Sequence, residues 1–581
     1  MAKKLINLII DGIKVKVEEG STILDAARAN GITIPTLCYL KDLNPIGACR
    51  MCLVEVKGAR GLVAACVYPV AEGMEVFTNT WKVIQARKQN LELLMSNHRK
   101  DCSDCLKSHF CKLKEYAETY MINDHKYDGE KHTHEPDTTS PCIIRDPSKC
   151  ILCKKCIAVC EKQQDVGVIH ANDRGFKTYI GCAFDEKMDK TACVGCGQCT
   201  LVCPTGALTE RTSYTEVFEK LADPNYIVVC SPAPSVRAAL GEEFGLPIGT
   251  DVEGKMITAL RRLGFKYVFD VDFAADLTIM EEGHEFLDRL NNGGKLPLIT
   301  SCSPGWINYC TAYYPEFIPN LSTAKSPMQM QGALTKTYWA QKMGIDPKKI
   351  FTVHIMPCTA KKSEIQYGCD ALKGMRDTDA VLTVRSLARM IRAMGINFPK
   401  LHDGKFDDLL GESTGAGVIF GASGGVMEAA LRTVADVVTG QDLKDIEYKK
   451  VRGIKGIKEA TITLKGKEIK VCAASGLANA RQVLEDVKSG KKQYHFIEIM
   501  CCPGGCVNGG GMPYVDYDQI DRDTVIKLRA KALYKNDANK EIRKSHKNPS
   551  IIKIYKEFLE KPNSHKAHEL LHRSYKKREF I

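Results

Sequence analysis

The chain has 581 residues, of which 44% are hydrophobic and 26% are charged, as is ordinary for a globular protein. This length predicts several domains. The sequence has no run of about 18 apolar residues, which argues against a membrane span, and its first residues lack the long apolar core of a signal peptide. We therefore expect a cytoplasmic protein.

The chain contains 26 cysteines, and most of them fall into five groups. Short, repeated Cys-x-x-Cys spacings are typical of metal–thiolate sites in a reducing compartment rather than of disulfides. Four groups lie within the first 203 residues, with spacings that iron–sulfur clusters require, and the fifth is divided among three distant loops. Clusters transfer electrons, whereas a divided set within a large domain indicates a catalytic metal site.

The first group follows a predicted hairpin that turns at Asp11 and Gly12 and a predicted helix that begins near Ser21. Its spacing, C-x10-C-x2-C-x13-C, resembles that of a plant-type [2Fe–2S] ferredoxin domain, a β-grasp fold, which we place at residues 1–82. A zinc ribbon would instead present two Cys-x-x-Cys pairs. The expected cluster ligands are Cys38, Cys49, Cys52 and Cys66.

The second group follows a predicted helix at residues 83–97 and combines one histidine with three cysteines. It is similar to a segment of iron–sulfur subunits in which such a set holds a [4Fe–4S] cluster. We place this module at residues 83–125. Its expected ligands are His98, Cys102, Cys105 and Cys111.

The third and fourth groups both have the spacing C-x2-C-x2-C-x3-C and predict a two-cluster ferredoxin domain at residues 139–212. In bacterial ferredoxins of this type, the fourth cysteine of each run binds the other cluster. The expected [4Fe–4S] ligand sets are therefore Cys150, Cys153, Cys156 and Cys203 for one cluster, and Cys193, Cys196, Cys199 and Cys160 for the other.

From about residue 213, strand-like apolar runs alternate with helical periodicity. This alternation predicts an α/β domain with parallel sheets at residues 213–520, so that the whole chain is multidomain, α+β and α/β. Ligands bind such domains at the carboxyl ends of the strands. Strands are expected at 226–230, 267–271, 296–300 and 350–356, and helices at 281–291 and 384–394.

Three cysteine-containing loops follow predicted strands of this domain: Thr300–Trp306, Met356–Lys362 and Glu498–Gly511. They resemble the three signature loops of [FeFe]-hydrogenases. Together with the N-terminal modules, the resemblance spans the whole chain. It is closest to the large multi-cluster clostridial enzymes and extends to the catalytic subunit of NADP-reducing hydrogenase complexes.

The resemblance implies the reaction 2H⁺ + 2e⁻ ⇌ H₂ at an H-cluster, a [4Fe–4S] cluster bridged through a cysteine sulfur to a diiron unit with CO, cyanide and dithiolate ligands. Cys358 and Cys502 are then cluster ligands, and Cys506 is the bridging ligand. Lys361 matches a cation that contacts a cyanide ligand. Further positions that match the cavity wall are Pro234, Ser235, Met356, Met500, Glu364 and Phe420.

The first loop departs from the family pattern, which has two adjacent cysteines, one a cluster ligand and the other the last proton donor. Here the pair is Cys302 and Ser303, and ungapped counting puts Cys302 at the donor place and Ser303 at the ligand place. A soft iron–sulfur cluster prefers thiolate, which favours Cys302 as the ligand and Ser303 as the donor. Both alternatives stay open, and the neighbouring Cys501 could also supply a thiol.

The family's proton path matches Glu282, Glu285, Arg289 and Ser322. Because Glu282 and Glu285 are three residues apart, they share one face of a helix, and proton transfer through a buried region needs such titratable groups. Without the cysteine loops, the same acids would indicate only a solvated helix surface.

Residues 521–581 match the family's small-subunit-like segment, with helices expected at 551–559 and 567–575. Much of the net charge of +12 lies in this segment. It forms either a solvated surface or a positive field that steers an acidic electron carrier. No nucleic-acid motif accompanies the charge, so nucleic-acid binding is not expected.

The resemblance implies ferredoxin as the electron carrier, with NAD(P)H acting through flavin-bearing partner subunits as the second choice. Direct nicotinamide binding is not expected, because no Gly-x-Gly-x-x-Gly motif precedes a helix. Maturation proteins are implied as well. Three other functions are alternatives to hydrogen turnover. An electron-transfer subunit would not need the three cysteine loops. A hydrogen sensor would carry a signalling domain, and an assembly factor would lack the intact loops or the acids of the proton path.

Overall fold

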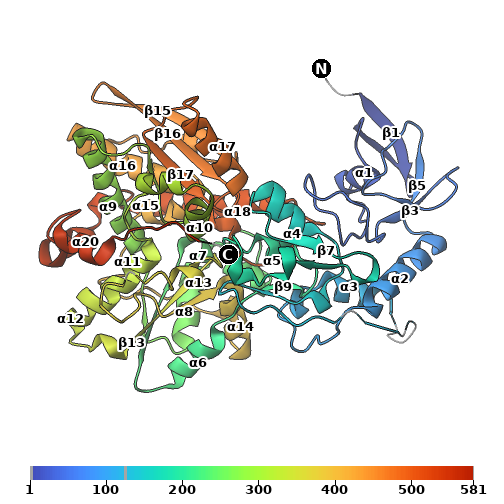
Figure 1. Cartoon of the computed structure of the whole chain (residues 1–581), viewed down its shortest axis with the longest axis horizontal. Coiled ribbons are helices and arrows are strands. Elements are labelled where there is room, and N and C mark those ends of the chain that lie inside the picture. Colours follow the sequence, from blue (N-terminus) through green and yellow to red (C-terminus); the bar gives the residue numbers. More distant parts are fainter. Residues whose placement is uncertain (1–3, 123–126, 128, 132, 369, 580–581) are drawn as a thin grey trace.

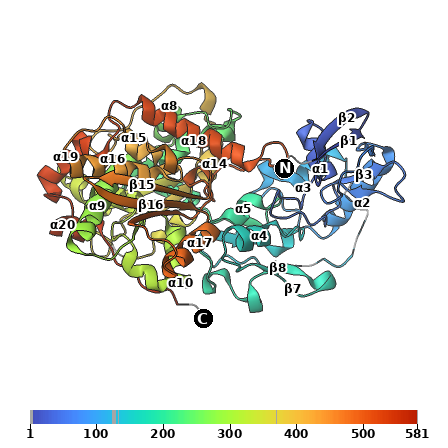
Figure 2. The same cartoon turned by 90° about the horizontal axis from the view of Figure 1, so that it is seen from above.

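A computed structural model of the chain describes residues 4–122, 127, 129–131, 133–368 and 370–579. The molecule is elongated, with the first module at one end and the large domain at the other (Figure 1). The two-run cysteine module lies between them, as the view in Figure 2 also shows. Within the described ranges, no helix is long and apolar enough to cross a membrane.

The first module is a five-stranded mixed sheet in the order β2-β1-β5-β3-β4, packed against helix α1. Its first two strands form the predicted hairpin, which turns through Asp11 and Gly12. Helix α1 begins close to Ser21, as expected, because Thr22 caps it. The Thr22 hydroxyl accepts the N–H of Asp25, and the Asp25 carboxylate accepts the N–H of Thr22. The bounds are β1 Leu5–Ile10, β2 Ile13–Glu18, α1 Ile23–Ala29, β3 Leu53–Val56, β4 Val63–Ala64 and β5 Glu75–Phe77.

The next two modules are built around their cysteines. Each run of the ferredoxin-like module leads into a short helix, the first into α4, which a π-helical turn extends, and the second into α5. Lys154 and Gly197, which precede these helices, have left-handed φ angles of 58° and 68°, so the chain turns sharply beside the cysteines. The bounds are α2 Trp81–Ser96, α3 Lys112–Thr119, β6 Ile143–Arg145, α4 Lys155–Ala158, β7 His170–Asn172, β8 Tyr179–Gly181, α5 Gln198–Val202 and β9 Leu208–Glu210.

The large domain contains two four-stranded sheets. One is fully parallel, in the order β11-β10-β13-β14, and in the other, β12-β17-β16-β15, only β15 is antiparallel. The predicted α/β architecture is therefore confirmed. The predicted strands all form, although β11 and β12 are two residues long. The bounds are β10 Ile227–Pro232, β11 Tyr267–Val268, β12 Leu298–Ile299, β13 Ile350–Met356, β14 Ala380–Thr383, β15 Ile457–Leu464, β16 Lys467–Ser475 and β17 Phe496–Met500.

Helices surround these sheets. The 22-residue helix α9, Val271–Asn292, includes the predicted helix at 281–291, and α14, Val384–Ala393, matches the other. Helix α9 contacts α11, α15 and α16, which buries its middle turns. The remaining bounds are α6 Tyr214–Ala222, α7 Pro234–Arg237, α8 Glu253–Arg262, α10 Pro304–Tyr313, α11 Pro327–Leu334, α12 Ala340–Met343, α13 Lys361–Glu364, α15 Gly415–Val418, α16 Gly425–Thr439 and α17 Leu477–Lys488.

The C-terminal segment wraps the large domain through α18 Arg522–Asn539, α19 Pro549–Ile554 and α20 His565–Leu571 (Figure 1). The predicted helix at 551–559 is α19 followed by a π-helical turn. The prediction of a helix at 567–575 was wrong at its C-terminal end, because α20 stops at Leu571. There the backbone pairs with the large domain instead: the N–H of Arg573 donates to the carbonyl of Thr323 at 2.8 Å.

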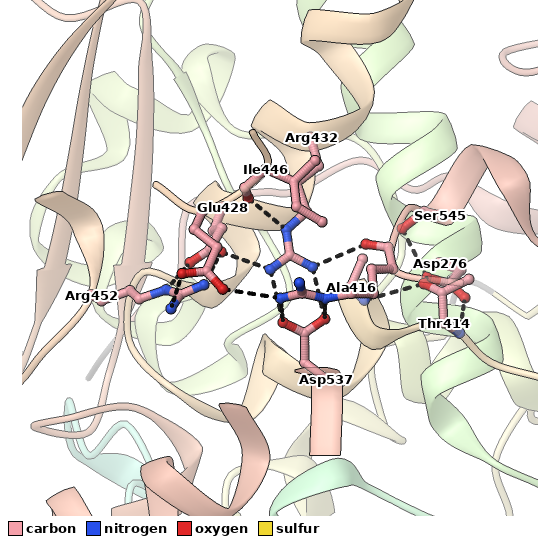
Figure 3. A network of polar contacts seen from close by, with 11 residues as sticks. Asp276, Thr414, Ala416, Glu428, Arg432, Ile446, Arg452, Asp537 and Ser545 are labelled. Atoms are coloured by element: carbon pink, nitrogen blue, oxygen red, sulfur yellow. Dashed lines mark hydrogen bonds and ion pairs between the residues drawn. The ribbon is translucent and has the colours of Figure 1, made fainter. Parts of the chain in front are cut away.

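A buried ionic network joins α18 to α16 (Figure 3). The guanidinium of Arg432, on α16, donates to both carboxylate oxygens of Asp537 at 2.9 Å and to Glu428 at 2.7 Å. Arg452 adds a hydrogen bond of 2.6 Å to Glu428, and Arg543 adds one of 2.7 Å to Asp537. Because removing one acid would leave a buried guanidinium without its partner, this network specifies where the tail packs.

Candidate functional site

The three cysteine loops start at the carboxyl ends of parallel strands. Strand β12 leads into the loop with Cys302, β13 into the loop with Cys358, and β17 into the loop with Cys502 and Cys506. Strand β10, beside β13, leads into α7, which begins at Pro234. The ends of both sheets therefore meet around one cavity of about 80 Å³.

Most of the predicted site residues of this domain line that cavity. Glu364 is absent from the wall but pairs with Lys361, which is part of it. The predicted residues on the wall are Pro234, Ser235, Cys302, Ser303, Met356, Cys358, Lys361, Phe420, Met500, Cys502 and Cys506. Cys501, which the sequence suggested only as a further thiol, is also on the wall.

Glycines allow the third loop to approach its neighbours closely. Gly505, just before Cys506, has φ of 95°, and a Cβ there would lie 2.6 Å from the backbone nitrogen of Ser423. A Cβ on Gly510 would lie 2.2 Å from the carbonyl oxygen of Cys196. The third loop is thus pressed against the second run of the ferredoxin-like module.

Lys361 places one cation at the cavity. Its Nζ donates to the carbonyl of Cys302 at 3.1 Å and to Glu364 at 2.7 Å, and its side chain is almost fully buried. Burial and the neighbouring Cys502 raise the pKa of Cys506 to about 12, while Lys361 acts in the opposite direction. The ammonium group therefore stabilises negative charge on the thiols and on any anionic ligand nearby.

The predicted proton-path residues gather along helix α9. Arg289 donates to Glu285 at 2.6 Å, and the hydroxyl of Ser322 donates to the other oxygen of Glu285 at 2.8 Å. Glu282 is buried one turn earlier, and among the described residues neither of its carboxylate oxygens has a hydrogen-bond partner. Burial, together with the charge of Glu285, raises the pKa of Glu282 to about 8.

Cys302 and Ser303 both line the cavity but differ in their neighbours. Burial and, next to it, Glu282 raise the pKa of the Cys302 thiol well above its usual range, while Lys361 acts in the opposite direction. Ser303 has extended backbone geometry, and its Oγ accepts the N–H of Cys501 at 3.2 Å. Because neighbouring side chains alternate along extended backbone, Ser303 points toward the third loop.

The sequence placed Glu498 at the start of the third loop but gave it no role. It lies in the buried strand β17 and accepts the N–H groups of Gly424 at 2.6 Å and Met427 at 2.8 Å. Lys458, which donates to the carbonyl of Ser423 at 2.7 Å, faces the same acid. A charged residue inside an apolar run that leads directly into a cysteine loop was the available signal.

The structure brings the cysteines of the two ferredoxin-like runs together as the two expected sets. One cavity is lined by Cys150, Cys153, Cys156 and Cys203, and another by Cys160, Cys193, Cys196 and Cys199, each of about 20 Å³. In the first module, the Sγ atoms of Cys52 and Cys66 are 3.3 Å apart, and Cys38 and Cys49 pack in one apolar cluster. Among the described residues, the buried Nδ1 of His98 has no hydrogen-bond partner.

These sets follow one another toward the large domain. The side-chain amide of Asn44 donates to the carbonyls of Cys38 at 2.8 Å and Cys153 at 2.9 Å, which links the first module to the ferredoxin-like module. The buried Lys107 lines a cavity with Cys203, and a Cβ on Gly206 would lie 2.4 Å from the Sγ of Cys105, so the second module adjoins the ferredoxin-like one. At the other end, Cys196 packs in the same apolar cluster as Cys501, which is in the wall of the large cavity.

Comparison with known families agrees with each part of the chain. Residues 226–510 match the iron only hydrogenase large subunit, C-terminal domain, and residues 523–578 match the iron hydrogenase small subunit. Residues 3–80 match a 2Fe-2S iron-sulfur cluster binding domain. Residues 87–126 match the NADH-ubiquinone oxidoreductase-G iron-sulfur binding region, and residues 149–207 match a 4Fe-4S dicluster domain.

Individual relatives match over nearly the full length. The chain is 47% identical to the NADP-reducing hydrogenase subunit HndD of Solidesulfovibrio fructosivorans, over 99% of this chain and 100% of that protein. It is 42% identical to iron hydrogenase 1 of Clostridium pasteurianum, over 98% of this chain and 100% of that protein. A solved structure of a variant of the apo [FeFe]-hydrogenase from Chlamydomonas reinhardtii matches with a TM-score of 0.57 and 39% identity, covering 63% of this chain and 99% of that one. The chain therefore belongs to the [FeFe]-hydrogenase family and is an iron hydrogenase whose catalytic domain is served by an accessory iron–sulfur electron relay.

Proposed function

We propose that the cavity between the three loops binds the H-cluster and that this chain interconverts protons and dihydrogen there. The observation that carries the proposal is the convergence of Cys358, Cys502 and Cys506 with Lys361 on one cavity. At about 80 Å³ it exceeds the two cavities of about 20 Å³ each that the four-cysteine sets line. The donor set fits a cubane, and the larger size leaves room for two further irons.

The H-cluster, when bound, supplies the metal centre at which electrons and protons combine. Cys358 and Cys502 would hold its cubane, and Cys506 would join the cubane to the diiron unit. Lys361 would hold an anionic ligand through a charge-assisted hydrogen bond. Pro234, Ser235, Met356, Met500 and Phe420 would enclose the diiron unit and exclude water. The Oγ of Ser235 is buried and has no hydrogen-bond partner within the part of the chain that the structure describes.

Protons would reach this site along α9. Arg289 and Ser322 orient Glu285 near the surface, and Glu282 carries the proton further inward. We assign the last donor to Cys302, because the Glu282 carboxyl acts on its thiol whereas the Oγ of Ser303 accepts the N–H of Cys501. This assignment reverses the preference that ligand softness alone suggested.

Electrons would travel through one [2Fe–2S] cluster and three [4Fe–4S] clusters held by the four N-terminal sets. The first two sets both adjoin the set of Cys150, Cys153, Cys156 and Cys203, so two entrances would merge there. The set of Cys193, Cys196, Cys199 and Cys160 then adjoins the catalytic cavity. Ferredoxin is the proposed electron carrier for this route.

The name of the relative from Solidesulfovibrio supports a second coupling, to NADP through partner subunits that carry flavin. The chain would act in the cytoplasm, where these carriers and the maturation proteins that build the diiron unit are found. Ferredoxin and NADP coupling are distinguished by testing which reduced carrier supports hydrogen production, alone and with the partner subunits.

The ligand role of Cys506 gives the direct test. Cys506→Ala should abolish hydrogen turnover and remove the CO and cyanide stretches from the infrared spectrum of matured protein, because the thiolate that joins the two parts is lost. Most accessory iron should remain. Cys472→Ala, a buried cysteine in β16, serves as the control and should retain both the bands and turnover. Turnover that survives in Cys506→Ala would overturn the proposal.

A further inference from the structure

The fourth ligand of the catalytic cubane is not settled by the loop motifs. A [4Fe–4S] cluster takes four protein ligands, usually thiolates. Cys358, Cys502 and Cys506 account for three of them under the proposed function. Three other side chains on the cavity wall could supply the fourth: Cys302, Ser303 and Cys501.

Two of these candidates are poorly placed or poorly suited. The thiol of Cys302 is assigned to the proton path under the proposed function, and a thiolate bound to iron could not carry a proton there. The Oγ of Ser303 already accepts the N–H of Cys501 at 3.2 Å. As a hard oxygen donor, a serine is also a weaker match than a thiolate for iron in a sulfide cluster.

Cys501 offers a thiol donor next to an assigned ligand. It is 4% exposed, it lines the cavity beside Cys502, and its Sγ accepts a hydrogen bond from the side-chain amide of Gln164 at 3.5 Å. Gly305 leaves room for this sulfur because it has no side chain: a Cβ at that position would lie only 2.6 Å from the Sγ of Cys501. Gln164 fixes the backbone, since its side-chain amide donates to the Cys501 carbonyl at 3.1 Å.

We propose that Cys501 supplies the fourth thiolate of the catalytic cubane and that Ser303 holds the Cys501 backbone in place for this role. The inference rests on the proposed function, since it assumes a cubane in this cavity. Binding replaces the S–H bond of Cys501 with an iron–sulfur bond and releases one proton, without a change of oxidation state.

The same placement has a consequence for electron transfer. Cys501 lies beside the neighbouring accessory set, because it packs in the same apolar cluster as Cys196. A ligand at Cys501 would therefore bring the catalytic cubane close to the adjoining cluster.

The test uses the full-length chain produced without maturation proteins, so that the diiron unit is absent and only cubanes and the [2Fe–2S] cluster form. Iron content and electron paramagnetic resonance (EPR) of the reduced protein are measured for Cys501→Ala, Ser303→Ala and the double variant Ser303→Cys with Cys501→Ala. We expect Cys501→Ala to lose about one to four irons per chain, as a cubane is lost or reduced to a three-iron form. Ser303→Ala should keep the cubane, and the double variant should regain it.

Two outcomes would overturn the inference: a cubane that persists unchanged in Cys501→Ala, or one that is lost in Ser303→Ala and kept in Cys501→Ala. Cys358→Ala separates this failure from failure of the proposed function. If Cys358→Ala also loses no iron, the cavity holds no cubane and the proposed function itself is wrong. Circular dichroism confirms that each variant is folded, and Cys501→Ser replaces Cys501→Ala if the latter is not.

Discussion

Two adjacent glutamates on α9 show how single residues acquire different roles. Glu281 is buried and satisfied: it accepts hydrogen bonds from the Tyr555 hydroxyl at 2.5 Å and the Asn563 N–H at 2.8 Å, and it lies 3.0 Å from His572 Nε2. Glu282 is buried on another face, with no partner for either oxygen among the described residues. A buried acid without partners is held neutral over a wide pH range, which suits a proton carrier.

Replacing Glu282 tests this role. Because its pKa is raised to about 8, the carboxyl is protonated below that pH and loses its proton as the pH rises through about 8. Glu282→Gln cannot pass a proton and should slow turnover by about 10²- to 10⁴-fold. The fall in hydrogen production above about pH 8 should disappear from its pH profile.

Stability separates this effect from damage to the fold. The raised pKa means that Glu282 favours the folded state at low pH and that this contribution is lost as the pH rises from 4.5 toward about 8. Gln resembles the protonated carboxyl, so the variant should retain stability and the infrared bands. Asp288→Asn, on the exposed face of the same helix, should behave like the parent. Unchanged turnover in Glu282→Gln would exclude it from the path.

At the scale of elements, α18 was not predicted from the sequence, because buried charged residues stand among its buried apolar ones. Ile526 and Leu533 pack in an apolar cluster, and ion pairs add to this packing. Arg529 pairs with Glu242 at 2.6 Å, and Asp537 pairs with Arg432. A Cβ on Gly415, in α15, would lie 2.0 Å from a carboxylate oxygen of Asp537. The helix therefore presses on α15, whose chain continues into Phe420 in the cavity wall.

Replacing Asp537 tests the network of Figure 3. Burial alone would raise the pKa of Asp537, but hydrogen bonds from Arg432 and Arg543 lower it. Asp537→Asn would leave both guanidinium groups without their charged partner and should lower the free energy of unfolding by about 3–5 kcal/mol. The change is measured as a shift in the denaturant midpoint by circular dichroism.

The control is Asp523→Asn, in the exposed first turn of the same helix, which should shift the midpoint little. Equal midpoints for the two variants would show that the network does not hold the tail. Loss of the infrared bands in Asp537→Asn alone would further show that α18 supports the cavity wall through α15.

At the scale of the whole molecule, Asp516 and Asp518, which follow the third loop, connect the catalytic domain to the first and second modules of the chain. Asp518 accepts hydrogen bonds from Arg28 at 2.5 Å, from the Thr36 hydroxyl at 2.7 Å and from the Tyr116 hydroxyl at 3.4 Å. Asp516 pairs with Lys112 at 2.7 Å. These contacts hold the outer clusters of the proposed relay against the inner ones.

Asp518→Ala should loosen this docking. Loss of the hydrogen bonds to a charged group costs about 1.5–3 kcal/mol, which raises the undocked population roughly 10- to 100-fold. Turnover with a protein donor that enters at the N-terminal modules should fall, while turnover with a small dye that reaches the inner clusters should change little. Limited proteolysis between the modules should become faster. Asp523→Asn is again the control, and equal rates with both donors would exclude a docking role.

Some basic residues of the C-terminal segment, residues 521–581, form ion pairs within the molecule. Lys544 pairs with Asp436 and Asp442, each at 2.6 Å, and Arg543 belongs to the network around Asp537. These two charges therefore contribute to packing, which the count of basic residues could not reveal. A role in steering an acidic carrier stays a prediction for the exposed remainder of the segment.

The sequence by itself determined the modular order, the α/β class of the large domain and the chemistry of the site, because cysteine spacing and strand periodicity are local properties of the chain. Tertiary structure decided what depends on distant segments meeting: that the loops of β12, β13 and β17 enclose one cavity, that Cys302 and Ser303 face different neighbours, and that Cys501 lies between two cysteine sets. Side-chain direction at these positions is set by packing across hundreds of residues, and no local pattern records it.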